Sequence, residues 1–116
     1  MKKLRVPLIV LALSLMMTAC SPNRKDVPIQ VHSDPLGAYA LMQVKRKKDL
    51  DNDWIFLGPT PINLEKSVNF DGVTQVSIKV IRAGFYEQVK SWTKKDFIRE
   101  SQQGDGILYI PNLVRQ

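Results

Sequence analysis

The sequence predicts a mainly β protein: a small antiparallel β-sandwich of six to seven short strands, with one short C-terminal helix and a helical signal peptide in front. Short segments rich in valine and isoleucine, with apolar residues at every second position, are typical of half-buried strands. Glycine and proline turns separate these segments at short, regular intervals, as in sandwich folds.

The first expected strand spans residues 27–32, where valine and isoleucine alternate with other residues. Pro28 favours an edge position or the start of that strand, because proline cannot donate to a β-ladder. After a turn, residues 38–45 alternate again without a plainly polar face, which indicates a central strand covered on both sides.

The charged residues 45–53 are expected to form the exposed tip of a long hairpin, from which residues 54–57 return as a strand. The remaining expected elements are an extended piece at 62–64, a polar loop at 65–72, and strands at 74–81, 85–92 and 106–110.

One helix is expected before the last strand. Thr93 is a candidate N-cap, with Asp96 three residues on as a weak capping box, and Gly104 is a candidate end of the helix. Phe97 and Ile98 would be its buried contacts.

The first twenty residues have the layout of a bacterial secretory signal: basic residues, an apolar run and small residues before Cys20. The apolar run is shorter than the ~17–25 residues of a membrane-spanning helix. Met17-Thr18-Ala19-Cys20 resembles the lipobox of bacterial lipoproteins, with methionine where that family usually has leucine. The alternative is a free or buried thiol at the end of an ordinary helical anchor.

The lipobox resemblance implies cleavage before Cys20, a diacylglyceryl group on its sulfur and an acyl chain on its new amino group. Two or more acyl chains hold a protein firmly in a membrane, at ~0.8 kcal/mol per buried CH₂. Ser21 resembles the outer-membrane pattern of enteric bacteria, in which aspartate marks retention in the inner membrane. We therefore expect an envelope location that favours the outer membrane over the inner.

The expected organisation has four parts: a cleaved signal peptide at 1–19, the lipidated cysteine and a tether at 20–26, a β-sandwich at 27–92, and an extension at 93–116 packed on the same domain. Removing Lys2, Lys3 and Arg5 with the leader lowers the Lys+Arg count from 17 to 14, against 11 Asp+Glu. A net charge this small does not favour binding to nucleic acid. Cys20 is the only cysteine, so stability must come from a packed core.

Turn residues in three places resemble the motifs of PEGA domains. Ser33-Asp34-Pro35-Leu36-Gly37-Ala38 resembles the opening Ser-x-Pro-x-Gly-Ala motif, and Gly58-Pro59-Thr60-Pro61-Ile62 resembles the Gly-x-Thr-Pro-hydrophobic motif. Residues 76–80 and Ala83-Gly84-Phe85-Tyr86 are similar to the closing strand and its turn. The resemblance covers residues 29–90. It implies a non-catalytic β-sandwich that serves as a structural or adhesion module.

No metal site, cofactor or catalytic site is expected. Asp49, Asp51 and Asp53 have the spacing of a calcium loop, but Trp54 replaces the turn glycine and the closing glutamate is missing. The adjacent His32, Ser33 and Asp34 would point to opposite faces of a strand, which prevents a hydrolytic triad. The chain is therefore predicted not to be an enzyme.

The candidate interaction surface comprises the hairpin residues Lys45, Arg46, Lys47 and Lys48 together with Trp54. These cations would contribute ~1 kcal/mol each near anionic lipid, but acidic neighbours cancel much of their field, and a solvated tip is the alternative.

Most of the aromatic residues are expected in the core, whereas an exposed tryptophan would favour glycan stacking. The aromatic residues considered for such stacking are Tyr39, Trp54, Phe56, Tyr86 and Trp92.

These observations predict a membrane-anchored, non-catalytic envelope lipoprotein. Its PEGA-like domain would act as a structural or binding module for peptidoglycan, another envelope polysaccharide, or an envelope protein. The alternative is an accessory or assembly subunit of an outer-membrane or cell-envelope complex. Retention on cell-wall polymer would favour the first, and a stoichiometric protein partner would favour the second.

Overall fold

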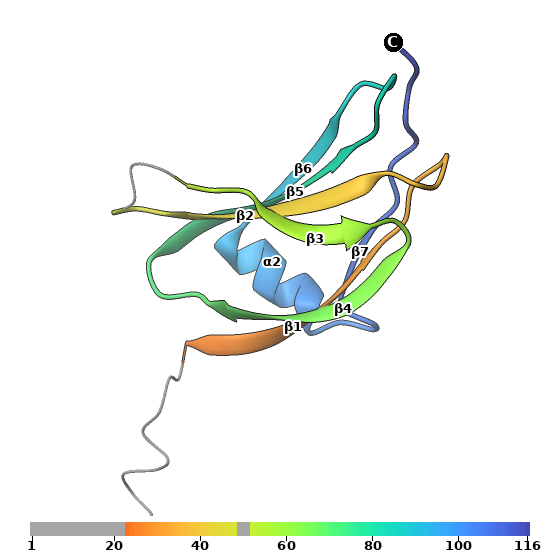
Figure 1. The fold of residues 1–116 in the computed structure, drawn as a ribbon. Coiled ribbons are helices and arrows are strands. Elements are labelled where there is room, and N and C mark those ends of the chain that lie inside the picture. The colour runs from red at the N-terminus through yellow and green to blue at the C-terminus, as the bar shows by residue number, and fades with distance from the viewer. Residues whose placement is uncertain (1–22, 49–51) are drawn as a thin grey trace, which may run out of the picture.

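A computed structural model describes residues 23–48 and 52–116. These residues form a mainly β domain of two stacked sheets with one helix, as the sequence predicts (Figure 1). The elements are β1 (Arg24–Val31), β2 (Tyr39–Arg46), β3 (Ile55–Pro59), β4 (Ile62–Asn69), β5 (Val73–Ile81), β6 (Gln88–Thr93), α2 (Lys94–Ser101) and β7 (Ile107–Tyr109). One sheet has the order β4-β1-β7 and the other β3-β2-β5-β6.

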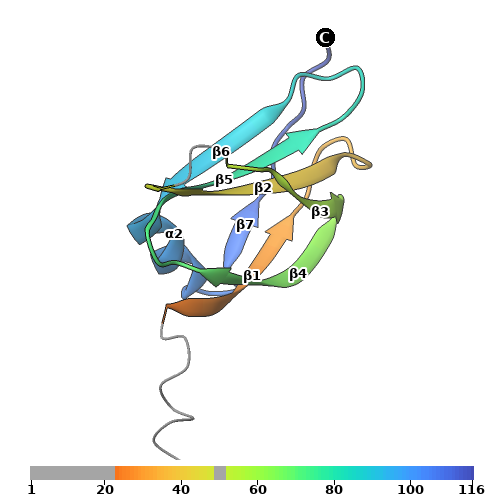
Figure 2. The ribbon, with the colours of Figure 1, turned by 60° about the vertical axis from the view of Figure 1, so that its left-hand side comes forward.

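The core lies between the two sheets, and Figure 2 shows the three-stranded sheet facing the four-stranded one. Every second residue of β1, β2 and β5 points inward, which confirms the alternation seen in the sequence. The fully buried members include Val27, Ile29, Val31, Ala40, Met42, Val76, Ile78 and Val80. Burying an aliphatic side chain of this size stabilises the fold by about 1.5–3 kcal/mol.

Helix α2 closes one side of the sandwich, where it contacts β1, β5, β6 and β7. The side chain of Thr93 accepts a hydrogen bond from the Asp96 N–H at 3.2 Å, so the predicted N-cap is confirmed. Phe97 is fully buried, and Ile98 is half-buried. The helix ends at Ser101 with Gln102 as its C-cap, so Gly104 does not close it.

The predicted polar loop at residues 65–72 is wrong, because β4 continues to Asn69. Its whole length pairs antiparallel with β1, from Val31↔Ile62 to Arg24↔Asn69. The strand is an edge of its sheet and alternates half-buried with exposed residues. Its inward row includes the half-buried Lys66, so the apolar alternation that marks a strand is interrupted.

Three further expectations about β1 are corrected. The strand begins at Arg24, so the second half of the predicted tether at 20–26 is paired with β4. Pro28 lies in the central strand of its sheet, not at an edge, although the ladder with β7 starts only at Ile29. The β1–β7 pairing is parallel, so the sandwich is not wholly antiparallel. The connection between these two parallel strands is long, as a parallel pair requires, since it runs from Val31 through β2 to β6 and α2 before it reaches Ile107.

The strand predicted at 85–92 begins only at Gln88. The residues before it pair instead with the C-terminal tail: Phe85 forms a bridge with Arg115, and the Tyr86 N–H donates to the Val114 carbonyl at 2.9 Å. This tail, which the sequence left without a role, therefore holds the turn before β6.

A buried pair of hydroxyls joins two of the turn motifs. The Ser33 Oγ and Thr60 Oγ1 atoms lie 2.7 Å apart, and both residues are buried. Thr60 Oγ1 also accepts a hydrogen bond from the Ala38 N–H at 3.0 Å, while Ser33 Oγ donates to the Pro35 carbonyl. The β1–β2 turn and the β3–β4 corner are thereby fixed to each other, which satisfies polar groups that would be costly to bury alone.

Replacing Gly106 by alanine is expected to lower the free energy of unfolding by about 2–4 kcal/mol. Gly106 has φ +94°, and a Cβ there would lie 2.5 Å from the Pro28 carbonyl oxygen and 2.8 Å from the Pro28 Cβ. Gly104→Ala is the matched control, because φ is +50° but no atom lies within 4 Å of the added Cβ. The control should cost about 1 kcal/mol in urea unfolding. Equal losses would contradict the close β1–β7 approach.

Candidate functional site

The predicted interaction surface is divided between two faces of the molecule. Lys45, Lys47 and Lys48 are exposed, whereas Arg46 is half-buried. The Arg46 backbone N–H donates to Asn52 Oδ1 at 3.3 Å, and its guanidinium donates to the Asp71 carbonyl at 2.7 Å. Cys20, the leader and the aspartates at 49 and 51 lie outside the described residues.

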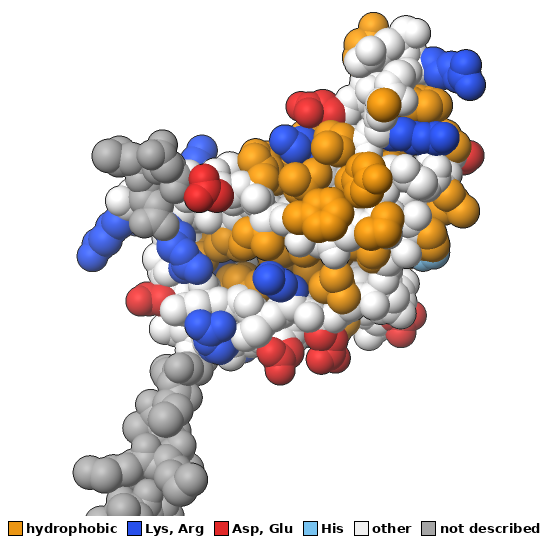
Figure 3. Space-filling model, in the orientation of Figure 1, with side chains coloured by type: hydrophobic (Ala, Val, Ile, Leu, Met, Phe, Trp, Pro, Cys, Tyr) orange, Lys and Arg blue, Asp and Glu red, His pale blue; other side chains and the backbone are white. Residues whose placement is uncertain are grey.

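Aromatic and aliphatic side chains are exposed on the outer surface of the four-stranded sheet, opposite to the core. We call them the outer aromatic face, and Figure 3 shows the hydrophobic side chains that gather over β3. Its members, on β2, β3, β5, β6 and the turn before β6, are the exposed Tyr39, Phe56, Tyr86 and Val89 and the half-buried Leu41 and Ile81. Phe56 is 59% and Tyr86 57% exposed, so these aromatics do not fill the core as the sequence predicted.

Two rings on this face are close together but not coplanar. The Tyr39 and Phe56 ring centroids lie 5.8 Å apart with their planes inclined at 43°. Tyr39, Ile81 and Tyr86 also line a shallow hollow of about 500 Å³ at the far end of β5. The outer aromatic face therefore continues into this hollow, which a side chain protruding from a partner can enter.

Trp54 lies beside the outer aromatic face and is half-buried. The Lys79 Nζ atom sits 4.2 Å from the centroid of its ring, as a cation–π contact. One face of the indole is thus occupied by an ammonium group. The other tryptophan, Trp92, is buried against Phe97 and Tyr109.

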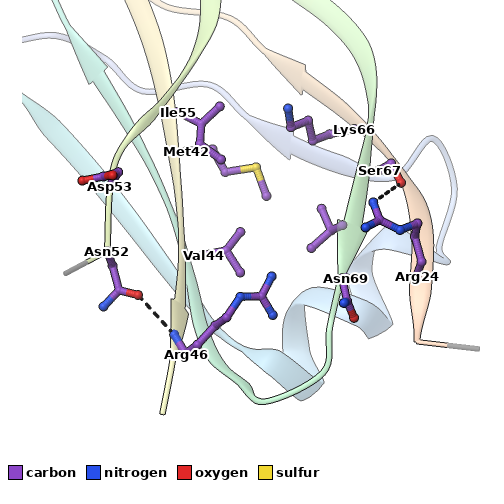
Figure 4. A pocket seen from close by; sticks show the side chains of 11 residues that line it. Arg24, Met42, Val44, Arg46, Asn52, Asp53, Ile55, Lys66, Ser67 and Asn69 are labelled. Carbon is purple, nitrogen blue, oxygen red and sulfur yellow. Dashed lines mark hydrogen bonds between the residues drawn. The ribbon is translucent and has the colours of Figure 1, made fainter. Parts of the chain in front are cut away.

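A second site is the groove between β3 and β4, with a volume of about 470 Å³ (Figure 4). We call it the β3–β4 groove. It has an apolar floor of core and near-core side chains with three basic side chains around it. The lining residues are Arg24, Met42, Val44, Arg46, Asn52, Asp53, Ile55, Lys66, Ser67, Val68 and Asn69.

No protein-family model, curated protein or solved structure gives a significant match to the chain.

The residues considered for catalysis are not brought together. His32 is exposed, whereas Ser33 is buried and its hydroxyl is committed to Thr60 and Pro35. In residues 23–48 and 52–116, no three His, Cys, Asp or Glu side chains form a metal-binding group. No helix in the same residues is long and apolar enough to cross a membrane. Burial raises the pKa of the Tyr109 hydroxyl, which packs against Trp92.

The sequence singled out Arg46 of the groove among the hairpin cations, and it considered Tyr39, Phe56 and Tyr86 for glycan stacking. It predicted neither site as the fold builds it. The outer aromatic face had a detectable signal in β2, whose two faces are both apolar. The β3–β4 groove had none, because its three cations come from three different strands.

Proposed function

We propose that the protein is a non-catalytic, lipid-anchored envelope lipoprotein that docks on a partner protein through the outer aromatic face. The anchor part rests on the lipobox-like sequence at residues 17–20. The docking part rests on one observation: neighbouring large apolar side chains are exposed on one sheet face and run into a hollow. Exposed apolar patches of this kind mark interaction sites in soluble domains.

The geometry favours a protein partner over a glycan. Sugars stack on open, flat ring faces, whereas the Tyr39 and Phe56 planes are inclined at 43° and Trp54 carries Lys79 on its ring. Aliphatic side chains of Leu41, Ile81 and Val89 lie among the rings. Mixed aromatic and aliphatic surfaces are typical of the central part of protein interfaces. This supports the role of an accessory subunit in an envelope complex.

Replacing Phe56 by serine is expected to reduce partner docking at least tenfold, since a central interface aromatic contributes ~2 kcal/mol or more. Phe56 is 59% exposed on an edge strand, so the fold should survive the change. The measurement is in-cell photocrosslinking from position 89 in wild-type and Phe56→Ser lipoprotein, with unfolding midpoints as the check on stability. Glu65→Ser, an exposed change on β4, is the matched control.

Three other outcomes of this experiment are informative. Equal crosslinking from position 103, which is exposed and remote from the sheet face, would contradict docking through that face. An adduct with the mass of two copies would identify the partner as a second copy of this chain. Phe56-dependent retention on purified peptidoglycan, without a protein adduct, would support the polymer-binding module instead.

A further inference from the structure

We infer that the β3–β4 groove binds the phosphate head groups of anionic lipids in the membrane that holds the protein. The inference rests on the proposed lipid anchor, and it assigns a second contact with the same membrane.

Three cations converge on the groove from three strands: Arg24 from β1, Arg46 from β2 and Lys66 from β4. Figure 4 shows the Arg46 and Lys66 side chains directed toward the space between the sheets, whereas the Arg24 side chain reaches from β1 to β4. The Arg24 guanidinium donates to Ser67 Oγ at 3.1 Å, which orients it at the groove. Neither Arg24 nor Lys66 forms an ion pair with any carboxylate in the described part of the chain. Arginine and lysine in such an arrangement bind phosphate oxygens.

The groove is also apolar where a lipid requires it. Met42, Val44, Ile55 and Val68 line it beneath the charged groups. A free anion gains nothing from such a floor, whereas the glycerol and first methylenes of a phospholipid bury apolar surface against it. Asp53 is the carboxylate among the described lining residues, and the charges of Arg24 and Lys66 exceed it.

The groove opens at the end of the domain where the chain enters. The Phe70 N–H donates to the Asn23 carbonyl at 3.0 Å, and the Lys47 N–H donates to the Gly72 carbonyl at 3.1 Å. These bonds hold the start of β1, the hairpin and the β4–β5 turn together (Figure 1). Three residues lie between Cys20 and Arg24, and the four extended steps that join them span at most about 14 Å. An acylated Cys20 therefore keeps Arg24 near the lipid head groups.

Edge protection explains only part of this arrangement. An inward-pointing lysine such as Lys66 prevents a free edge strand from pairing with another chain. That role does not account for Arg24 and Arg46, which line the same groove. Basic and acidic side chains are mixed at this end of the domain, since Asp26 and Asp71 lie near Lys25 and Lys47. Recognition must therefore depend on the groove itself, not on a broad basic surface.

The test uses the acylated full-length protein in vesicles of phosphatidylcholine, with or without phosphatidylglycerol. Acetylation of Lys66 is followed by mass spectrometry against Lys90, which is exposed on the opposite edge of the four-stranded sheet. We expect phosphatidylglycerol to slow acetylation of Lys66 about fivefold, equivalent to ~1 kcal/mol of protection, and to leave Lys90 unchanged.

Arg24→Gln should remove this protection, whereas Lys25→Gln, an equal charge change at the next residue but outside the groove, should keep it. Equal effects of the two variants would overturn the inference in favour of diffuse attraction. Equal Lys66 rates in the two vesicles would also overturn it. Protection by inorganic phosphate in phosphatidylcholine vesicles would replace it with a free-anion site. A preparation whose intact mass lacks acyl chains would overturn the anchor itself, and so distinguishes the two failures.

Discussion

Replacing Phe97 by alanine is expected to lower the free energy of unfolding by about 3–5 kcal/mol. The side chain is fully buried, and its ring lies 6.1 Å from that of Phe70 and 5.5 Å from that of Trp92. Phe70 follows the last residue of β4 and Trp92 belongs to β6, so Phe97 joins both sheets through α2. Its removal leaves a cavity that rigid strands on both sides cannot fill.

Small domains have total stabilities of only about 5–15 kcal/mol, so this variant should unfold at a markedly lower urea concentration. Circular dichroism and tryptophan fluorescence follow the transition. Lys95→Ala is the control on the same helix, because Lys95 is exposed and alanine is a good helix former. It should change the free energy of unfolding by less than about 0.5 kcal/mol. A similarly small effect of Phe97→Ala would mean that residues 93–116 are not part of the core.

The strands that the sequence predicted well are those with one continuous apolar row. In β5, Val76, Ile78 and Val80 are all buried, and in β1 Val27, Ile29 and Val31 are too. The helix was also predictable, because an N-cap such as Thr93 acts locally through the backbone N–H groups that follow it. Local signals were sufficient wherever a residue's structural role was decided by its near neighbours.

The wrong predictions about the strands have one physical cause: they depend on pairing between residues far apart in the sequence. The end of β4 looks polar because Lys66 interrupts its inward row and the alternate residues face solvent. Only its pairing with β1 makes it a strand. The parallel β1–β7 contact joins residues 78 positions apart in sequence, such as Ile29 and Ile107, and depends on the path through α2. No local pattern specifies that path.

The two candidate sites also depend on how strands far apart in the sequence pair with one another. The outer aromatic face exists because β3 and β6 place Phe56 and Val89 on the same surface as Tyr39 and Leu41. Sequence reasoning assigned most aromatics to the core on size alone, and that holds for Trp92 but not for Phe56. Size predicts that an aromatic tends to be buried, but strand register decides which face it occupies.

Replacing Cys20 by serine is expected to abolish acylation and cleavage, so that the variant keeps residues 1–19 while the wild type loses them. The basis is the lipobox-like Met17-Thr18-Ala19-Cys20, where the cysteine sulfur is the expected site of the diacylglyceryl group. Intact mass and membrane fractionation of both proteins make the measurement. Two acyl chains supply stable anchoring that one chain does not, and Ser21 resembles the outer-membrane pattern, so we expect the wild type in the outer-membrane fraction.

Ser21→Ala is the matched control for this experiment, since it changes the neighbouring hydroxyl residue and leaves the cysteine in place. It should be acylated and cleaved like the wild type. A wild-type protein that keeps its leader, or that is found without lipid, would contradict the anchor. The β-sandwich would stand, because its core consists of described residues from Val27 to Leu113. The outer aromatic face would then have to act without a membrane to orient it, and the β3–β4 groove would lose the lipid surface that makes its three cations useful.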